Sequence, residues 1–105
     1  MKLTSEELKQ KINSGEKFIV DLYADWCGPC RMIGPIVEKV AKQLEEEGSE
    51  VSLYKFDIEQ DKEMAVSLGV RSIPAIKGFN GGENVTNKIG VITETQLREM
   101  VKEIL

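Results

Sequence analysis

Three consecutive segments between residues 17 and 58 constrain the fold more than any other feature of the sequence. Residues 17–23 have apolar side chains on both faces, which is typical of a buried central strand. From Pro29 to Glu47, apolar residues recur at helical spacing with Lys and Glu between them, and this predicts a long amphipathic helix. Residues 51–58 return to a strand pattern. A strand, a helix and a strand in this order predict a right-handed unit with two parallel strands.

The rest of the chain completes a mixed α/β layout. A capping box at Thr4-Ser5-Glu6-Glu7 predicts a short first helix, which ends at Asn13-Ser14-Gly15. The other predicted elements are a helix over 61–68, strands over 75–79 and 85–91 joined by the turn Asn80-Gly81-Gly82, and a last helix after Thr93. With 105 residues, 41% of them hydrophobic, we expect one domain, residues 1–105. Its central sheet is expected to have helices on both faces.

Composition excludes several classes of function. The formal net charge of −4 and the interspersed charged residues argue against a nucleic-acid partner. No apolar stretch approaches the roughly 20 residues that span a bilayer, and the first residues do not match a signal peptide, so we expect no membrane partner and a cytoplasmic location. The chain has no histidine, which excludes imidazole-activated nucleophiles and histidine metal sites.

The only two cysteines, Cys27 and Cys30, lie between the first predicted strand and the long helix. The carboxyl end of a strand is where open α/β sheets place their sites. As a structural staple, a Cys27–Cys30 bridge would close so short a loop that it would add only roughly 2 kcal/mol. As half of a zinc site, the pair would need two more ligands, and the chain offers neither a histidine nor a second cysteine pair. Redox exchange is the interpretation that remains best supported.

The position of the pair at a helix N-terminus suits this chemistry. Unpaired N–H groups and the positive end of the helix dipole stabilise a thiolate, most directly at the more N-terminal cysteine. We therefore expect Cys27 to be the nucleophile and Cys30 the resolving thiol. The gain from a lower thiol pKa is partly offset by weaker nucleophilicity, so the larger advantage should come from intramolecular attack by Cys30 on a mixed disulfide.

The five residues Trp26-Cys27-Gly28-Pro29-Cys30 resemble the active-site sequence of the thioredoxin family, and the Gly-Pro pair is typical of its reducing members. The resemblance extends over nearly the whole chain through the order of elements. It implies a thioredoxin fold and a protein-disulfide reductase activity. It also implies disulfide-containing proteins as substrates and a thioredoxin reductase as the external source of electrons. The redox-active disulfide would be the only cofactor, with no bound organic group or metal.

Asp21 and Lys55 are two further candidates for the catalytic site. Asp21 lies inside an apolar strand, where a charge costs several kcal/mol unless it is paired or protonated. The resemblance implies that Asp21 assists proton transfer at Cys30 through water, and that Lys55 on the adjacent strand pairs with it. From the residues alone, Asp21 could also be a solvated carboxylate at the strand end. Lys55 could equally be an edge lysine whose ammonium reaches water.

The resemblance also implies a substrate-binding surface around Cys27. Ile73-Pro74 resembles the family's cis-proline segment, which offers backbone hydrogen bonds to a substrate peptide, although only about 5% of X-Pro bonds are cis in general. Gly90 resembles the third loop of this surface. The residues implied to form the apolar patch are Trp26, Gly28, Pro29, Ile73, Pro74, Ile89, Gly90 and Val91. Without the resemblance, Ile89 and Val91 would be ordinary strand residues.

The sequence departs from the family pattern in two regions. The usual N-terminal strand is reduced to Met1-Lys2-Leu3, so we expect about four strands and a more exposed or differently covered strand 51–58. Lys77 and Gly78 interrupt a strand that is normally apolar, and a glycine there should weaken the strand.

Two other functions remain as alternatives. The apolar patch could clamp a partner protein while the cysteines only stay reduced, which would make the chain an interaction module. An oxidase or isomerase with the same two cysteines is the nearest enzymatic alternative. We expect a monomer in each case.

Overall fold

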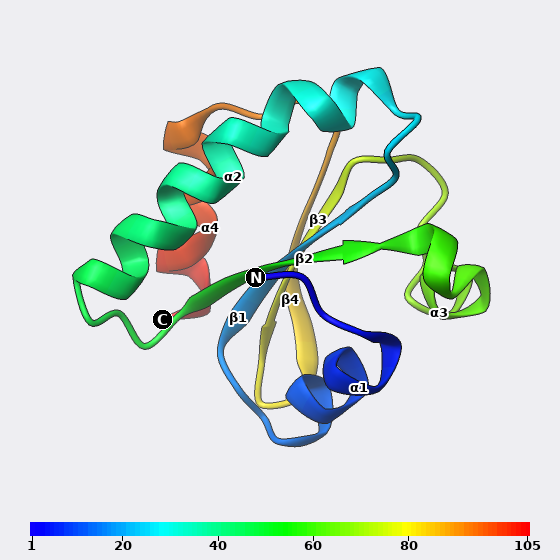
Figure 1. The fold of residues 1–105 in the computed structure, drawn as a ribbon. Helices are drawn as coiled ribbons and strands as arrows, with labels where there is room; N and C mark the ends of the chain where they lie inside the picture. Colours follow the sequence, from blue (N-terminus) through cyan, green and yellow to red (C-terminus); the bar gives the residue numbers. More distant parts are fainter.

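The computed structural model describes residues 1–105 and contains one four-stranded sheet with helices on both faces (Figure 1). The helices are α1 (Ser5–Asn13), α2 (Gly28–Glu46), α3 (Lys62–Ser67), α4 (Glu94–Ile104) and a short 3₁₀ helix, η1 (Ile58–Gln60). The strands are β1 (Phe18–Tyr23), β2 (Ser52–Asp57), β3 (Ala75–Asn80) and β4 (Glu83–Ile89). These elements confirm the predicted α/β class and the predicted number of strands. No helix is long and apolar enough to cross a membrane.

The strand order is β2-β1-β3-β4, and the sheet is mixed. Strand β1 pairs in parallel with β2, as the long intervening helix requires, and antiparallel with β3. Strands β3 and β4 form the expected hairpin, with a register shift between Gly78 and Phe79. Strand β1 is central, and helices cover both faces of the sheet, so all six of its side chains are buried.

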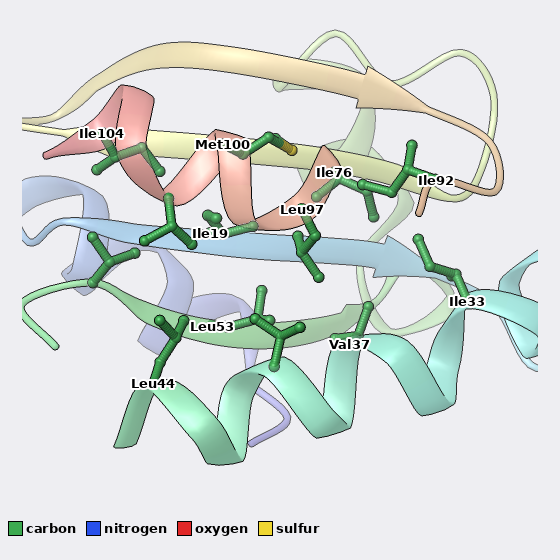
Figure 2. Close-up of a cluster of buried hydrophobic side chains, with 13 residues drawn as sticks. Ile19, Ile33, Val37, Leu44, Leu53, Ile76, Ile92, Leu97, Met100 and Ile104 are labelled. Carbon is green, nitrogen blue, oxygen red and sulfur yellow. The ribbon is translucent and has the colours of Figure 1, made fainter. Parts of the chain in front are cut away.

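Each face of the sheet is covered by a different pair of helices. Helices α2 and α4 enclose one apolar cluster, in which Ile19, Leu53 and Ile76 of three strands meet the two helices (Figure 2). On the opposite face, α1 and α3 cover a second cluster that contains Phe18, Phe56 and other strand residues. Figure 1 shows the two helix pairs on opposite sides of the strands. The sheet therefore has two separate cores, one on each face.

The N-terminal strand is reduced to one bridge, as the sequence predicts. Lys2 pairs in parallel with Lys55, and this bridge contains the hydrogen bonds from Leu3 N–H to the Lys55 carbonyl at 2.8 Å and from Lys55 N–H to the Met1 carbonyl at 2.9 Å. The outer edge of β2 is thus covered only around Lys55. Leu3 is fully buried and anchors this short segment in the cluster beneath α1.

Two predicted strands extend past their observed carboxyl ends, and local structure explains both. The strand predicted over residues 51–58 ends at Asp57, because the Asp57 side chain accepts the Glu59 N–H at 2.9 Å and starts η1. The strand predicted over residues 85–91 runs from Glu83 to Ile89. It ends there because Gly90 has a φ of 87°, which turns the chain out of the ladder before Val91.

Candidate active site

Cys27 and Cys30 lie at the junction between the carboxyl end of β1 and the first turn of α2. Cys27 is the N-cap residue of α2, and its sulfur accepts the Cys30 N–H at 3.2 Å. Pro29 occupies the first turn, where its missing N–H is not needed. The two cysteines form a disulfide across a Cα–Cα distance of 5.2 Å, and both are buried. The helix N-terminus therefore holds a reducible disulfide whose Cys27 sulfur already receives a backbone hydrogen bond.

The loop before β3 lies directly against Cys27. The Ile73–Pro74 peptide bond is cis, as the resemblance implied. The Cys27 Sγ lies 3.8 Å from the Ile73 carbonyl oxygen. The Gly90 N–H donates to the Pro74 carbonyl at 2.9 Å, so the loop after β4 is tied to the same segment. The structure thus brings together three chain segments that are far apart in the sequence.

The predicted substrate-binding residues differ in their exposure. Trp26 is 65% exposed and Ile89 is 66% exposed, while Pro29 and Val91 are also on the surface. The partly buried members are Gly28, Ile73 and Gly90, and Pro74 is buried, so it can contribute only through its backbone. Trp26 and Ile73 line one groove of about 320 Å³ together with residues of η1 and α3. The Trp26 indole N–H donates to the Glu59 carboxylate, which holds the ring at the edge of this groove.

Asp21 is buried on the face of β1 that α2 covers. It is 1% exposed, and neither of its carboxylate oxygens has a hydrogen-bond partner within the protein. Burial raises the pKa of Asp21 from its ordinary value of 3.8 to about 7, against the opposing effect of the Lys55 charge. The alternative of a solvated carboxylate at the strand end is therefore wrong. A group with this pKa can gain or lose a proton near neutral pH.

Lys55 does not form the expected ion pair with Asp21. The two residues are register partners on parallel strands, but the Lys55 ammonium lies 3.6 Å from the Glu38 carboxylate of α2. It also lies 4.7 Å from the centre of the Tyr23 ring. Helix α2 provides the Glu38 carboxylate and β1 provides the Tyr23 ring, and these two groups hold the Lys55 ammonium. Lys55 acts on Asp21 through its charge rather than through contact.

A cavity of about 340 Å³ opens beside Cys30 on this side of the site. Its lining includes Cys30, Tyr23, Lys55 and Glu38. The sequence analysis missed Glu38 and Tyr23 as members of the site. Tyr23 could have been found, because it is two residues after Asp21 and therefore shares its face of the strand. Nothing in the spacing of Glu38 distinguishes it from the other charged residues of the helix.

No group of three or more cysteine, aspartate or glutamate side chains is arranged to hold a metal ion. The candidate site therefore consists of the disulfide, the carbonyl groups of the Ile73–Pro74 segment, and the buried Asp21 on the strand that leads to the disulfide.

Comparisons with known proteins show which family this chain is similar to. The family model described as thioredoxin matches residues 1–103. A thioredoxin from Mycoplasmoides gallisepticum is 36% identical over 96 residues, which cover 91% of this chain and 92% of the relative. Thioredoxin 1 from Nostoc is 33% identical over 104 residues, covering 98% of this chain and 94% of the relative.

Solved structures show the same similarity. A mutant thioredoxin from Halobacterium salinarum superimposes with a TM-score of 0.85 at 30% identity, covering 99% of this chain and 88% of the other. A chain from a structural study of thiol resolution in a yeast mitochondrial 1-Cys peroxiredoxin through the glutathione and thioredoxin systems has a TM-score of 0.83 at 27% identity. That match covers 98% of this chain and 93% of the other.

Proposed function

We propose that this chain, which belongs to the thioredoxin family, uses Cys27 as the nucleophile and Cys30 as the resolving thiol in the reduction of protein disulfides. Its activity is thiol–disulfide exchange through a cycle between the Cys27–Cys30 dithiol and disulfide. The observation that carries the assignment of roles is the hydrogen bond from the Cys30 N–H to the Cys27 sulfur at the N-terminus of α2. This bond and the helix dipole stabilise negative charge on Cys27.

The first step is attack by the Cys27 thiolate on a substrate disulfide. A bond forms between Cys27 Sγ and one substrate sulfur, while the other substrate sulfur leaves as a thiolate and takes a proton. The carbonyl oxygen of Ile73, 3.8 Å from Cys27 Sγ, lies where it can accept a backbone N–H of the bound substrate segment. Trp26 and Ile89 offer exposed apolar surface beside the reacting sulfur.

In the second step, Cys30 attacks Cys27 Sγ and releases the second substrate thiolate. The Cys30 thiol must lose its proton as it attacks, and Asp21 is the candidate acceptor, through water. A carboxyl group with a pKa of about 7 can take this proton and return it at neutral pH. The substrate gains two electrons, and the protein ends with the Cys27–Cys30 disulfide.

The regeneration partner and the cellular setting are further parts of the proposal. The reductase that returns two electrons to the disulfide is proposed to be a thioredoxin reductase, because the chain belongs to the family that this class of enzyme serves. We also propose that residues 1–105 act as one monomeric domain in the cytoplasm, with no cofactor besides the disulfide. The presence of only two cysteines, both in one local pair, suits a reducing compartment.

Reduction of insulin with dithiothreitol as electron donor tests the assignment of roles. Cys27→Ser should lose activity. Cys30→Ser should accumulate a mixed disulfide between Cys27 and the substrate, because the resolving step is removed. Thr95→Ser, an exposed change on α4, is the control and should keep full activity. Full activity in either cysteine variant would overturn the proposal.

A further inference from the structure

Lys77 is a cation in the interior of the sheet with no carboxylate partner. It lies on β3 between the buried residues Ile76 and Gly78 and is itself half-buried. Its ammonium donates to the side-chain carbonyl of Asn87, the residue opposite it on β4, at 2.9 Å. It forms no ion pair. Burial lowers the pKa of Lys77, so its environment disfavours the charge that the side chain carries at neutral pH.

A second cation lies beside the same small cavity. Arg71, from the loop before β3, lines it together with Lys77, and its volume is about 50 Å³. Lys88 of β4 also borders the cavity, but it follows Asn87 on the strand, so its side chain points to the opposite face of the sheet. No carboxylate is part of this lining, and neither Arg71 nor Lys88 forms an ion pair. The cavity beside Cys30 differs, because Arg31 and Lys55 are balanced there by Asp25 and Glu38. A chain of net charge −4 therefore has one cavity lined by uncompensated positive charge.

This cavity adjoins the candidate active site. Arg71 and Ser72 line both the small cavity and the groove beside Trp26, and Ile89 lines the small cavity as well. From Pro74 to Lys77 the strand advances by three residues, or about 10 Å at about 3.3 Å per residue. Consider an extended substrate segment whose cysteine reacts with Cys27. A side chain three to four residues from that cysteine would lie about 10 Å away and could reach Lys77.

Resting on the proposed disulfide reductase function, we propose that Lys77 and Arg71 form a binding site for carboxylate groups of the substrate protein. The protein then prefers disulfides that lie within a few residues of an acidic segment. A carboxylate at this cavity would compensate the two positive charges, and the guanidinium of Arg71 can bind it in bidentate geometry. The same charges would raise the rate of encounter with acidic partners.

Two disulfide-linked peptide dimers test this preference. The peptides are identical except that three Glu residues in one, placed three to five positions from the cysteine, are Gln in the other. Each peptide is made in two versions, with the three Glu or Gln residues before or after the cysteine, because the peptide chain could bind in either direction. The reduced protein is mixed with each peptide, and oxidation is followed by the fluorescence of Trp26, its only tryptophan. Each rate is divided by the rate with dithiothreitol alone, which corrects for the effect of Glu on the peptide thiol.

The wild-type protein should reduce the Glu peptide about two- to tenfold faster than the Gln peptide at low ionic strength, since one exposed ion pair changes affinity by about 1.4- to 5-fold. Raising the ionic strength to about 0.15 M should shrink this preference. Lys77→Leu, which keeps an apolar stem in the strand, should bring the ratio close to one. Arg71→Gln, at an exposed loop position, should lower it without changing the sheet. Lys102→Gln removes an exposed charge from α4 and should leave the preference intact.

Equal corrected rates for both peptides with the wild-type protein would overturn the carboxylate site. A preference that persists unchanged in both Lys77→Leu and Arg71→Gln would overturn it as well. Failure to reduce either peptide would be a different result, because it would contradict the proposed reductase function itself. Thermal unfolding of each variant shows whether it is folded. If Lys77→Leu does not fold, Arg71→Gln still tests the proposal.

Discussion

The two faces of strand β1 have opposite compositions, although both are fully covered. On the face beneath α1 and α3, Phe18, Val20 and Leu22 are completely buried in an apolar cluster. On the face beneath α2 and α4, Ile19 is followed by Asp21, whose carboxylate is buried without a partner. The first face contributes stability and no chemistry. The second face loses stability because it holds a buried titratable group, Asp21. Because side chains alternate along a strand, β1 provides stability on one face and a titratable group on the other.

Phe18→Ala should cause the largest loss of stability. Phe18 is fully buried, with its ring centre 5.0 Å from that of Phe79 and 5.8 Å from that of Tyr54. Removing such a ring costs about 3–5 kcal/mol of unfolding free energy, and the aromatic contacts place this site at the upper end. Chemical denaturation measures the loss, with the exposed Val85→Ala as control. Because no titratable group is involved, the loss should be the same at about pH 5 and pH 8, and a strong dependence on pH would contradict the contrast between the faces.

Asp21→Asn should stabilise the protein at alkaline pH. Below its ordinary pKa of 3.8 the carboxyl group is protonated in both the folded and the unfolded chain, so it contributes no difference. Between that value and the folded-state pKa of about 7, only the unfolded chain releases the proton, and stability falls as pH rises. Above about 7 the full loss is present, on the order of 4 kcal/mol.

Denaturation of the wild type and of Asp21→Asn across pH 4 to 8 measures this difference. The two proteins should diverge as pH rises, with the variant more stable at about pH 8. Asp25→Asn, an exposed change after the same strand, is the matched control and should follow the wild type. Parallel curves for Asp21→Asn and the wild type would show that the buried face holds no titrating group.

Gly78→Ala should destabilise the protein by an intermediate amount. A Cβ at position 78 would lie 2.5 Å from both Ile104 Cδ1 and Thr86 Cγ2, so α4 packs against a strand position with no room for a side chain. Overpacking of this kind costs about 1–3 kcal/mol. Thermal unfolding should show the loss, and adding Ile104→Val should recover part of it by removing the closest methyl group. An additive loss in the double variant would contradict this packing.

Glu38→Gln should have the smallest effect, confined to the titration of Asp21. The charged group that acts on Asp21 is Lys55 from β2, whose ammonium lies 3.6 Å from the Glu38 carboxylate, while β3 offers the apolar Ile76 in register. Without Glu38, the Lys55 ammonium is free to approach Asp21, so the pKa of Asp21 should fall by about 0.3–1 pH units. Carbon-13 NMR of the Asp21 carboxyl group measures it. Glu94→Gln, which removes the partner of Lys39 on the far part of α2, should leave it unchanged.

The sequence predicts the architecture well because its strongest signals are local. The capping boxes at Thr4 and Thr93 both form, and the alternation of strand and helix patterns places β1, α2 and β2 within one or two residues. The ends that fail depend on single side chains or torsions, such as the Asp57 carboxylate and the φ of Gly90. Gly78 was expected only to weaken β3. The need for a glycine there arises from α4, which lies distant in the sequence.

The candidate site was predictable where a short motif or a resemblance defined it. Cys27, Cys30 and the Ile73–Pro74 segment lie together as expected, and Asp21 is buried in β1, the strand before them. The position of the Lys55 ammonium was not predictable, because a flexible lysine side chain can contact any carboxylate or aromatic ring within its reach. The nearest carboxylate, Glu38, comes from another element. Periodicity specifies which face a residue occupies, and it does not specify which of several partners it contacts.

The polar groups that the loop segments bring to the site belong to the main chain. The Ile73 carbonyl lies against Cys27, and the Gly90 N–H donates to the Pro74 carbonyl. Mutations that replace the side chains of Ile73, Ile89 or Val91 can therefore accumulate without removing these groups. Over evolutionary time, the choice of partners is free to diverge while the exchange reaction is retained. Lineages with different substrates could descend from one ancestor through changes at the rim of the site alone.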